Sequence, residues 1–457
     1  MRLRTLITLL LLTLAAGVLV QADGIIKVVP RPAGPRSGPE FREGEVIVAF
    51  RPQIDLRDVE PMLRAGGGVK ARRARSRPRF LVSLEPGIAV PEAVAWFESM
   101  EEVDYAEPNG LVRKSQTTFT PNDEFFEFQW NMELVEARRT WAIQKGQPSV
   151  GVAVLDTGVA YEDYHDPRTG RFYGRAPDWG DVTFLPGWDA VNEDAHPNDD
   201  EFHGTHVAST IAEGTDNSVG VTGLAFGCAI MPVKVLDEVG TGTFFDVAEG
   251  IDYATEYSQG GEQPVKVINM SLGTDGFSET VSRAVDEAYR NGIVLVAAAG
   301  NTGRAGIDFP ASLANVIAAG AVDARGERAS YSSTGSELAL MAPGGDCDRD
   351  DDRDSLPDCV FQQMPDPDFV DVGIYDQFCY CGLDGTSMSA PHVSAAAALL
   401  ISQGITEPDA VLAALEQNAE KIGGAPEDGR NDTVGYGLIQ PAPALSGLGF
   451  NQGPVSP

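Results

Sequence analysis

Basic residues are scarce in this sequence, which carries 34 Lys and Arg against 67 Asp and Glu and has a formal net charge of −33. Residues 1–115 hold 17 basic and 14 acidic residues, whereas the remainder of the chain holds 17 and 53. Nucleic-acid binding depends on basic patches that neutralise phosphates, so nucleic acid is excluded as an expected partner. The excess of carboxylates favours solubility outside the cell and offers the oxygen ligands that calcium needs.

Long apolar runs are also missing, with one exception at the start of the chain. Arg2 and Arg4 precede an apolar run at residues 6–20, and residues 20–22 suit cleavage by a signal peptidase. This pattern predicts a secretory signal peptide over residues 1–22. A membrane anchor is the alternative, but the run is at the short end of a bilayer span. We therefore expect a secreted protein that has no membrane contact once the signal is removed.

Cysteine is rare and unevenly placed. One of the five, Cys228, stands alone in an apolar run, which predicts a buried free thiol. The other four are clustered late in the chain: Cys347, Cys359, Cys379 and Cys381. In an exported protein, four clustered cysteines predict two disulfides, and the sequence leaves every connectivity open.

A small module precedes the main part of the chain. Strand-like runs at residues 45–50 and 80–84, with an amphipathic helix at 90–100, predict an α+β module of two helices on a sheet at about residues 41–109. We assign residues 23–115 to this N-terminal part.

The polar stretch that follows is typical of a cleavable junction, and it contains Arg113-Lys114. A second domain is then expected over residues 116–457. It includes an unusual Cys- and Asp-rich insert at about residues 345–382, where Asp348, Asp350, Asp352 and Asp354 alternate as in some calcium-binding loops.

Apolar strands alternate with helices in the second domain. Short, β-branched runs predict buried strands at residues 150–156, 230–236, 265–271 and 292–299. Helices are expected at residues 206–212, 244–257, 278–291 and 387–403. This alternation predicts a doubly wound α/β fold with a mostly parallel sheet and helices on both faces, in which functional residues collect at the carboxyl ends of the strands.

Three residues of the second domain suit nucleophilic catalysis. Asp156 closes a strand, His203 opens a string of small residues that lets a helix start close to the sheet, and Ser387 follows Gly385 near the start of another helix. A serine hydroxyl becomes a nucleophile when an imidazole takes its proton and a carboxylate orients that imidazole. The sequence therefore predicts an Asp156–His203–Ser387 triad.

Acyl transfer also needs a donor directed at the developing oxyanion. Asn301 follows the strand predicted at residues 292–299, so its side-chain amide is expected to lie at the same edge of the sheet. We predict that Asn301 has this role.

The order Asp, His, Ser and the strings around these residues resemble the subtilisin-like serine protease family, and its thermitase-like bacterial members in particular. Five separated blocks match in order: LDTG, HGTHVA, NMSLG, AAAGN and GTSMSAP. An α/β-hydrolase also uses such a triad, but its order is Ser, acid, His, and its G-x-S-x-G elbow is not found at Ser387.

The resemblance implies a self-processing serine endopeptidase that acts on protein or peptide substrates. In that family a propeptide assists folding and then inhibits the enzyme, which is the role implied for residues 23–115. It also implies that Ser271, Leu272 and Gly273 form the edge strand that pairs with the substrate backbone.

The same resemblance places Asp308, which precedes Phe309-Pro310, at the floor of the first specificity pocket. A carboxylate there favours Lys or Arg in the substrate. If Asp308 instead points to solvent, a broad apolar preference is expected.

Structural calcium is the cofactor that the resemblance implies. A first site is expected to use Asp123 or Asp178 with a loop that contributes Thr215, Asn217, Val219 and Val221. A second site is expected to use Asp189, Asn192 and Asp194, and a solvated acidic loop is its alternative. Residues 160–175 are read as an insertion relative to the family.

Two other functions compete with a general endopeptidase. A non-catalytic protein that keeps the fold for binding is disfavoured by the presence of all the catalytic residue types. A kexin-like processing protease that is restricted to basic sites would usually carry a further β-domain, and only twelve residues follow Leu445, where the resemblance to the family ends.

Overall fold

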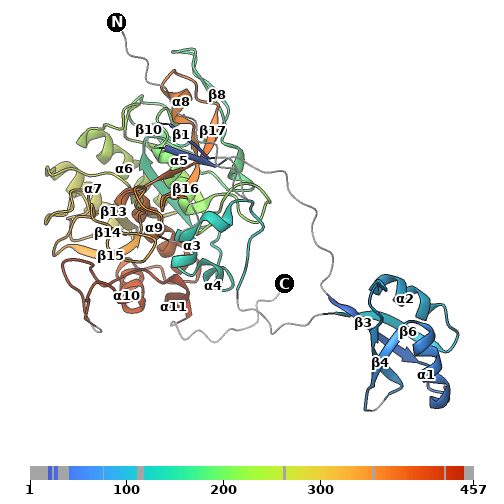
Figure 1. Cartoon of the computed structure of the whole chain (residues 1–457). Coiled ribbons are helices and arrows are strands. Elements are labelled where there is room, and N and C mark those ends of the chain that lie inside the picture. Colours follow the sequence, from blue (N-terminus) through green and yellow to red (C-terminus); the bar gives the residue numbers. More distant parts are fainter. Residues whose placement is uncertain are drawn as a thin grey trace, which may run out of the picture. The chain divides into compact units, whose positions relative to one another are not determined.

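The structure is a computed structural model that describes residues 19–22, 25–28, 41–75, 77–110, 118–260, 264–351, 356–426 and 429–446 (Figure 1). Most of the predicted signal peptide and the Arg113-Lys114 junction lie outside these residues. The chain forms two compact units, one of Pro32–Gln116 and one of Met1–Arg31 with Thr117–Pro457. No helix among the described residues is long and apolar enough to cross a membrane.

The smaller unit is a four-stranded antiparallel sheet with two helices. Its elements are β3 (Phe41–Phe50), α1 (Leu56–Ala65), β4 (Gly68–Arg73), β5 (Arg79–Leu84), α2 (Val90–Glu98) and β6 (Val103–Gly110), with the strand order β4-β5-β3-β6. The Asp55 side chain caps α1 by accepting the Arg57 backbone N–H (2.9 Å). Val46, Val82 and Phe97 are fully buried in its core. The predicted α+β module is confirmed.

The larger unit is built on a seven-stranded parallel sheet. Its strands, in spatial order, are β10 (Trp188–Asp189), β11 (Ala229–Lys234), β7 (Gly151–Asp156), β12 (Val265–Met270), β13 (Val294–Ala298), β14 (Val316–Val322) and β15 (Leu338–Pro343). Every neighbouring pair is parallel. All residues of β7 are buried, as a central strand covered on both faces requires.

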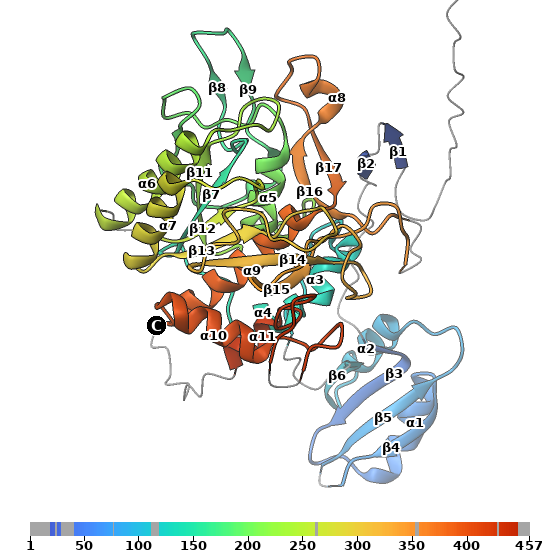
Figure 2. The same cartoon turned by 90° about the vertical axis from the view of Figure 1, so that its left-hand side faces the viewer.

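Helices cover both faces of this sheet. The helices α5 (His203–Ala212) and α9 (Thr386–Ser402) pack on one face, and α6 (Phe244–Gly260) and α7 (Glu279–Arg290) on the other (Figure 2). Successive strand residues alternate between the two cores, with Val152 and Val154 facing α5 and α9 and Ala153 and Leu155 facing α6 and α7. The predicted doubly wound α/β fold is confirmed, and α5 begins three residues earlier than expected.

Two hairpins interrupt this pattern. The strands β8 (Tyr164–His165) and β9 (Phe172–Tyr173) pair within the predicted insertion. In the Cys-rich insert, β16 (Val360–Pro365) and β17 (Phe378–Leu383) flank α8 (Pro367–Val370) and extend a sheet that contains β1 (Leu19–Ala22) and β2 (Ile25–Val28). The cysteines pair as Cys347–Cys359 and Cys379–Cys381, and Cys228 is a buried free thiol.

The remaining elements are short and lie around the sheet. They are η1 (Phe126–Phe128), α3 (Trp130–Leu134), α4 (Ala137–Trp141), η2 (Pro177–Trp179), α10 (Pro408–Asn418) and α11 (Pro441–Ser446).

Candidate active site

Two of the predicted catalytic residues lie at or just after the carboxyl ends of strands of the parallel sheet, and the other two lie at the starts of helices that pack on it. Asp156 is the last residue of β7, and Asn301 follows β13 by three residues. His203 is the first residue of α5 and Ser387 the second residue of α9, and both helices pack on the same face of the sheet. Parallel strands bring their carboxyl ends to one edge, so the fold gathers these side chains there.

Asp156 and His203 are in direct contact. The Asp156 carboxylate is fully buried, and its Oδ1 lies 2.7 Å from His203 Nδ1. Gly204 permits this approach, because a Cβ at that position would lie 2.1 Å from the Gly158 carbonyl oxygen. Burial disfavours the charged imidazole, but the charge of Asp156 and the hydrogen bond to it prevail and raise the pKa of His203 to about 9.

Ser387 lies at a helix start that is shaped by its neighbours. Gly385 adopts a φ of +147°, which side chains disfavour, and the chain turns there into α9. Pro391 lacks an N–H for the Ser387 carbonyl, and that carbonyl accepts the Ser271 hydroxyl instead (2.8 Å). The Ser387 hydroxyl donates to the Ser271 carbonyl (3.2 Å), and the described contacts include no hydrogen bond from it to His203.

The orientation of the Asn301 amide is fixed by the residue before Ser387. Asn301 Oδ1 accepts both the backbone N–H and the hydroxyl of Thr386, each at 2.9 Å. Because these groups donate to the oxygen, the amide Nδ2 points the other way. A Cβ at Gly385 would lie 3.4 Å from this nitrogen and 3.7 Å from the Ser387 backbone nitrogen. The amide is therefore held beside Ser387 with its N–H groups available.

A cleft of about 660 Å³ opens beside this centre. Ser271, Leu272 and Gly273 line it together with His203 and residues 240–244. The leucine, valine and phenylalanine side chains in its wall are Leu236, Phe244, Val247, Leu272, Val281 and Phe309. A predominantly apolar cleft of this size accommodates an extended peptide with apolar side chains.

Comparisons with known proteins agree with this geometry. Residues 147–437 match the Subtilase family model, and residues 28–109 match the Fervidolysin N-terminal prodomain. The chain belongs to the subtilase family. It is a subtilisin-like serine protease with an N-terminal prodomain.

Relatives support this membership over most of the chain. A Thermophilic serine proteinase of Bacillus sp. (strain AK1) is 35% identical over 84% of this chain and 84% of its own. Thermitase of Thermoactinomyces vulgaris is 34% identical over 67% of this chain and 94% of its own. A solved protease of Pseudoalteromonas arctica PAMC 21717 matches 72% of this chain and 99% of its own, with 30% identity and a TM-score of 0.59.

Asp308 of this subtilase lies between two glycines at the edge of the cleft. A Cβ at Gly300 would be 2.5 Å from Asp308 Oδ2, and one at Gly273 would be 2.9 Å from Asp308 Cβ. The half-buried carboxylate therefore faces the slot between the segments that follow β12 and β13. Burial and the charge of Asp275 raise its pKa.

Glu201 is an acidic residue in the lining of the cleft, and the sequence analysis did not identify it. Glu201 and His203 are the only ionisable residues in the cleft lining that the structure describes. Glu201 Oε2 accepts the His203 backbone N–H (2.8 Å), and burial raises the pKa of its carboxyl to about 7. Its position two residues before His203 is the feature of the sequence from which its place in the site could have been predicted.

The residues of the first predicted calcium site are brought together. Asp178 Oδ1 accepts the Asn217 amide (2.7 Å), Asp178 Oδ2 accepts the Val221 backbone N–H (3.2 Å), and Asp123 accepts the Asp216 backbone N–H (2.7 Å). Asn217 Oδ1 accepts the Val219 backbone N–H (2.8 Å). Thr215 lies in the same loop.

Among the residues that the structure describes, no Lys or Arg pairs with the carboxyl groups at this loop. Burial raises the pKa of Asp123 to about 6 and that of Asp178 to about 7. Glu213, which the sequence analysis also missed, is fully buried, and burial together with the charge of Asp178 raises the pKa of its carboxyl. Clustered acids with raised pKa values suit a bound cation, although the described residues hold no group of three His, Cys, Asp or Glu side chains arranged for a metal.

The loop that contains Asp189, Asn192 and Asp194 has different surroundings. Asp189 accepts the backbone N–H and the side-chain amide of Asn192, at 2.8 and 2.9 Å. The Asp194 carboxylate pairs with the guanidinium of Arg168, which comes from the β8–β9 hairpin.

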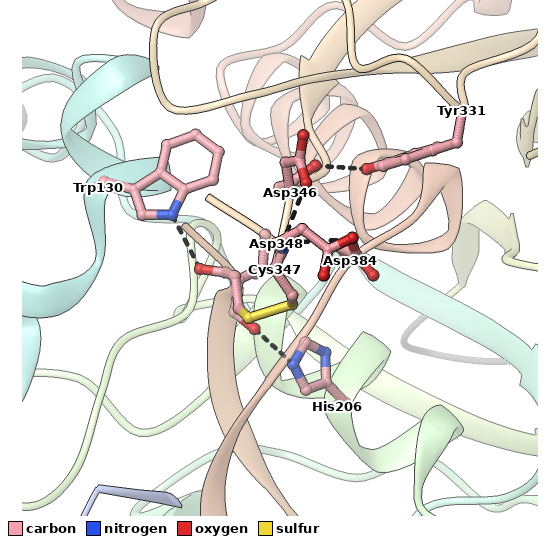
Figure 3. The surroundings of a disulfide bond; sticks show 10 residues. Trp130, His206, Tyr331, Asp346, Cys347, Asp348 and Asp384 are labelled. Carbon is pink, nitrogen blue, oxygen red and sulfur yellow. Dashed lines mark hydrogen bonds between the residues drawn. A yellow bond between two sulfur atoms is a disulfide. The ribbon is translucent and has the colours of Figure 1, made fainter. Parts of the chain in front are cut away.

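The disulfide-bonded insert packs on the helix that begins with His203. His206 Nε2 donates to the Val360 carbonyl at the start of β16 (2.9 Å), and Trp130 donates to the Cys359 carbonyl (2.8 Å) (Figure 3). The Cys347 N–H donates to Asp384, three residues before Ser387 (3.1 Å). The insert therefore braces the segments that carry both His203 and Ser387. Of its alternating aspartates, Asp352 and Asp354 lie outside the described residues.

Proposed function

We propose that this subtilase is a secreted endopeptidase that hydrolyses peptide bonds through an acyl-enzyme. Asp156, His203 and Ser387 form its triad, and Asn301 stabilises the oxyanion. The observation that carries the proposal is the 2.7 Å contact between buried Asp156 and His203, because His203 lines the same cleft as Ser271, whose carbonyl accepts the Ser387 hydroxyl.

The reaction follows from the positions of these groups. The Ser387 hydroxyl turns from the Ser271 carbonyl towards His203, whose Nε2 takes the proton as Oγ attacks the scissile carbonyl carbon. The Asn301 amide then donates to the negatively charged oxygen. His203 returns the proton to the leaving amine as the C–N bond breaks, and water attacks the acyl-enzyme with His203 again acting as base. Asp156 holds the imidazole in the tautomer that accepts at Nε2.

Substrate binding uses the backbone at residues 271–273. An extended peptide adds itself along this segment by main-chain hydrogen bonds, which recognise no particular side chain. The apolar lining of the cleft then accommodates the side chains on the acyl side of the scissile bond. Broad sequence tolerance follows.

Asp308 narrows this tolerance towards basic residues at the first specificity pocket. Its carboxylate lies between Gly273 and Gly300, where it pairs with a Lys or Arg side chain of the substrate. A charge-assisted contact of about 1.5–3 kcal/mol corresponds to roughly a tenfold to hundredfold preference. The same contact would underlie a kexin-like restriction to basic sites.

Peptides that differ only in the residue before the scissile bond test the role of Asp308. Wild type is expected to cleave after Lys and Arg faster than after Phe and Leu, and Asp308→Asn is expected to reverse that order. If wild type and Asp308→Asn both prefer Phe and Leu to Lys and Arg, and to the same extent, the acidic pocket is wrong and only the broad specificity is left.

Maturation is proposed to proceed by self-processing. Residues 1–22 are removed as a signal peptide, residues 23–115 act as an intramolecular inhibitor, and residues 116–457 form the mature enzyme. The prodomain match at residues 28–109 supports the inhibitor, and one relative is named Minor extracellular protease Epr (Bacillus subtilis). The junction Arg113-Lys114 suits a pocket with an acidic floor.

Ser387→Ala tests catalysis and maturation together. Removal of the nucleophile is expected to abolish peptide hydrolysis and to leave the precursor uncut near residues 113–119, as measured by intact mass. Ser389→Ala, two residues further along α9, is the matched control and should mature. A fully processed Ser387→Ala protein, purified without other proteases, would refute self-processing.

Structural calcium is proposed at the loop after α5. Asp123 and Asp178 fit this role because both are acids whose pKa burial raises, and Asp123 Oδ1 is buried with no hydrogen-bond partner among the described residues. Asn217 and the backbone oxygens of Thr215, Val219 and Val221 would complete the ligands. The ion would supply the positive charge that these residues lack.

A further inference from the structure

The acidic loop at residues 189–198 faces the β8–β9 hairpin across a cavity of about 340 Å³. Asp189 and Asn192 line the cavity from the loop, and Asp166 and Arg168 line it from the hairpin. The resemblance to the subtilisin family would make this loop a second calcium site. Whether a metal ion can bind there depends on which of its oxygen atoms are free to act as ligands.

Arg168 makes the contacts that a cation would make. Its Nη2 pairs with Asp194 Oδ2, and its Nη1 donates to the Asn192 carbonyl (3.1 Å). Its Nε donates to Asp166 Oδ1 (3.3 Å). The guanidinium therefore bridges two carboxylates and a backbone carbonyl, which its planar set of five N–H donors allows.

The other carboxylate oxygens of Asp189 and Asp194 accept hydrogen bonds from N–H groups of the same loop. Both carboxylate oxygens of Asp189 accept N–H groups of Asn192, so the Asn192 amide turns its nitrogen and not its oxygen to Asp189. Asp194 Oδ1 accepts the His196 backbone N–H (2.8 Å). Calcium takes six to eight oxygen ligands and would also be repelled by the adjacent guanidinium. The residues as arranged do not fit a calcium ion.

The hairpin is held in place by contacts that do not involve the Arg168 side chain, and these contacts position the guanidinium in advance. The Tyr164 ring stacks on the His196 ring with centroids 3.8 Å apart, and Glu162 lies 2.9 Å from His196 Nδ1. At the hairpin tip, the Asp166 carboxylate accepts the Arg168 backbone N–H (2.8 Å) and the Thr169 hydroxyl (2.7 Å). The turn and the ring stack thus fix the place from which Arg168 reaches the loop.

We propose that the guanidinium of Arg168, supplied by the β8–β9 hairpin, replaces calcium as the cation of the acidic loop at residues 189–198. This subtilase therefore binds no calcium at that loop. The order of the loop, which ends five residues before His203, depends on an ion pair within the chain and not on the calcium concentration outside the cell.

Arg168→Gln tests the replacement, because it removes the charge and leaves the carboxylates for a metal. The protein is first inactivated with a serine-reactive sulfonyl fluoride, so that self-digestion does not distort the measurement. Tm is then measured in chelator and in millimolar calcium, and bound calcium is counted by equilibrium dialysis. We expect Tm in chelator to fall by a few degrees, calcium to restore part of it, and one more calcium ion to bind per chain than in wild type.

Two further variants control this experiment. Arg168→Lys keeps the charge and should bind no additional calcium. Arg171→Gln removes a neighbouring guanidinium of the same hairpin that pairs with Glu238, and it should not gain a calcium ion either. If Arg168→Gln binds no more calcium than wild type, the replacement is wrong.

Asp194→Asn provides a test that does not require the Arg168 variants to fold. In an otherwise wild-type chain, it should leave the number of bound calcium ions unchanged. A loss of one ion would show that the natural loop already holds calcium and would overturn the proposal. If the sulfonyl fluoride does not react, that result counts against the proposed catalysis. The number of bound calcium ions still tests the replacement by Arg168.

Discussion

Two acidic segments flank the helix that begins with His203, and they are neutralised in different ways. The loop before α5 contains Asp194, which pairs with Arg168, and Asp200, which pairs with Lys234. The loop after α5 meets Asp178, and no Lys or Arg pairs with that carboxylate among the described residues. In a chain with a net charge of −33, the source of each counter-charge decides which segments respond to calcium.

The largest effect is expected when the chain loses a cation that neutralises the loop before α5. Lys234 is 1% exposed, and its Nζ contacts Asp200 (2.6 Å) and two backbone carbonyls. Lys234→Met leaves the buried Asp200 without its partner, and we expect the free energy of unfolding to fall by about 3–5 kcal/mol. Urea unfolding of the inhibited protein measures this change.

An exposed ion pair is the control for Lys234. Arg283 pairs with Glu279 one helical turn away (2.8 Å) at the surface of α7, and Arg283→Met should cost less than about 1 kcal/mol. Equal losses in the two variants would mean that burial does not distinguish the pairs.

Chelation tests the loop after α5. An ion that binds the folded state alone stabilises it by about 2.7 kcal/mol at a concentration one hundred times its Kd. We expect chelator to lower the Tm of wild type because this stabilisation is lost. The Tm of Asp178→Asn should be almost the same with and without chelator, as measured by calorimetry.

Asp181→Asn is the matched control, because this exposed carboxylate lies three residues from Asp178. It should keep the full response to chelator. An identical response in Asp178→Asn and Asp181→Asn would place the calcium elsewhere.

Glu201 extends the comparison to an acid that pairs with no Lys or Arg among the described residues and has no proposed metal. Its charge helps to raise the pKa of His203, after that of Asp156. The neutral imidazole is the active base, so kcat/KM should rise with pH through a midpoint above the ordinary 6.5. Burial raises the pKa of Glu201 to about 7, so its charge is present where His203 titrates. Glu201→Gln removes that charge and should lower the midpoint by less than about one pH unit.

The pH profile of kcat/KM on an uncharged peptide provides this measurement. Glu249→Gln, on the exposed side of α6, should leave the midpoint unchanged. A midpoint that stays fixed or rises in Glu201→Gln would show that Glu201 does not act on His203.

The sheet and its helices were predictable because each element follows its own local pattern. The strand at Gly151–Asp156 is apolar and β-branched, and the small residues after His203 suit a helix packed closely on the sheet. The motif strings also allowed the prediction of the residues that the fold gathers at one edge. Their catalytic roles remain predictions.

What the sequence did not predict depends on contacts between distant segments. Arg168 and Asp194 are 26 positions apart and meet through a hairpin of two-residue strands, which leaves no periodic signal. The cysteine pairs were equally open, because spacing alone does not order four cysteines. The burial of Glu213 was not predicted either, because a buried acid at the end of a helix has the same local sequence as an exposed one.

Covalent labelling of the nucleophile is the most direct test of the proposed chemistry. A peptidyl phosphonate reacts with an activated serine, and the modified peptide is located by mass spectrometry. We predict one adduct per mature chain, on Ser387, and no adduct in His203→Ala, which lacks the base. Labelling at Ser271 or Ser389, or undiminished labelling in His203→Ala, would contradict the proposed triad.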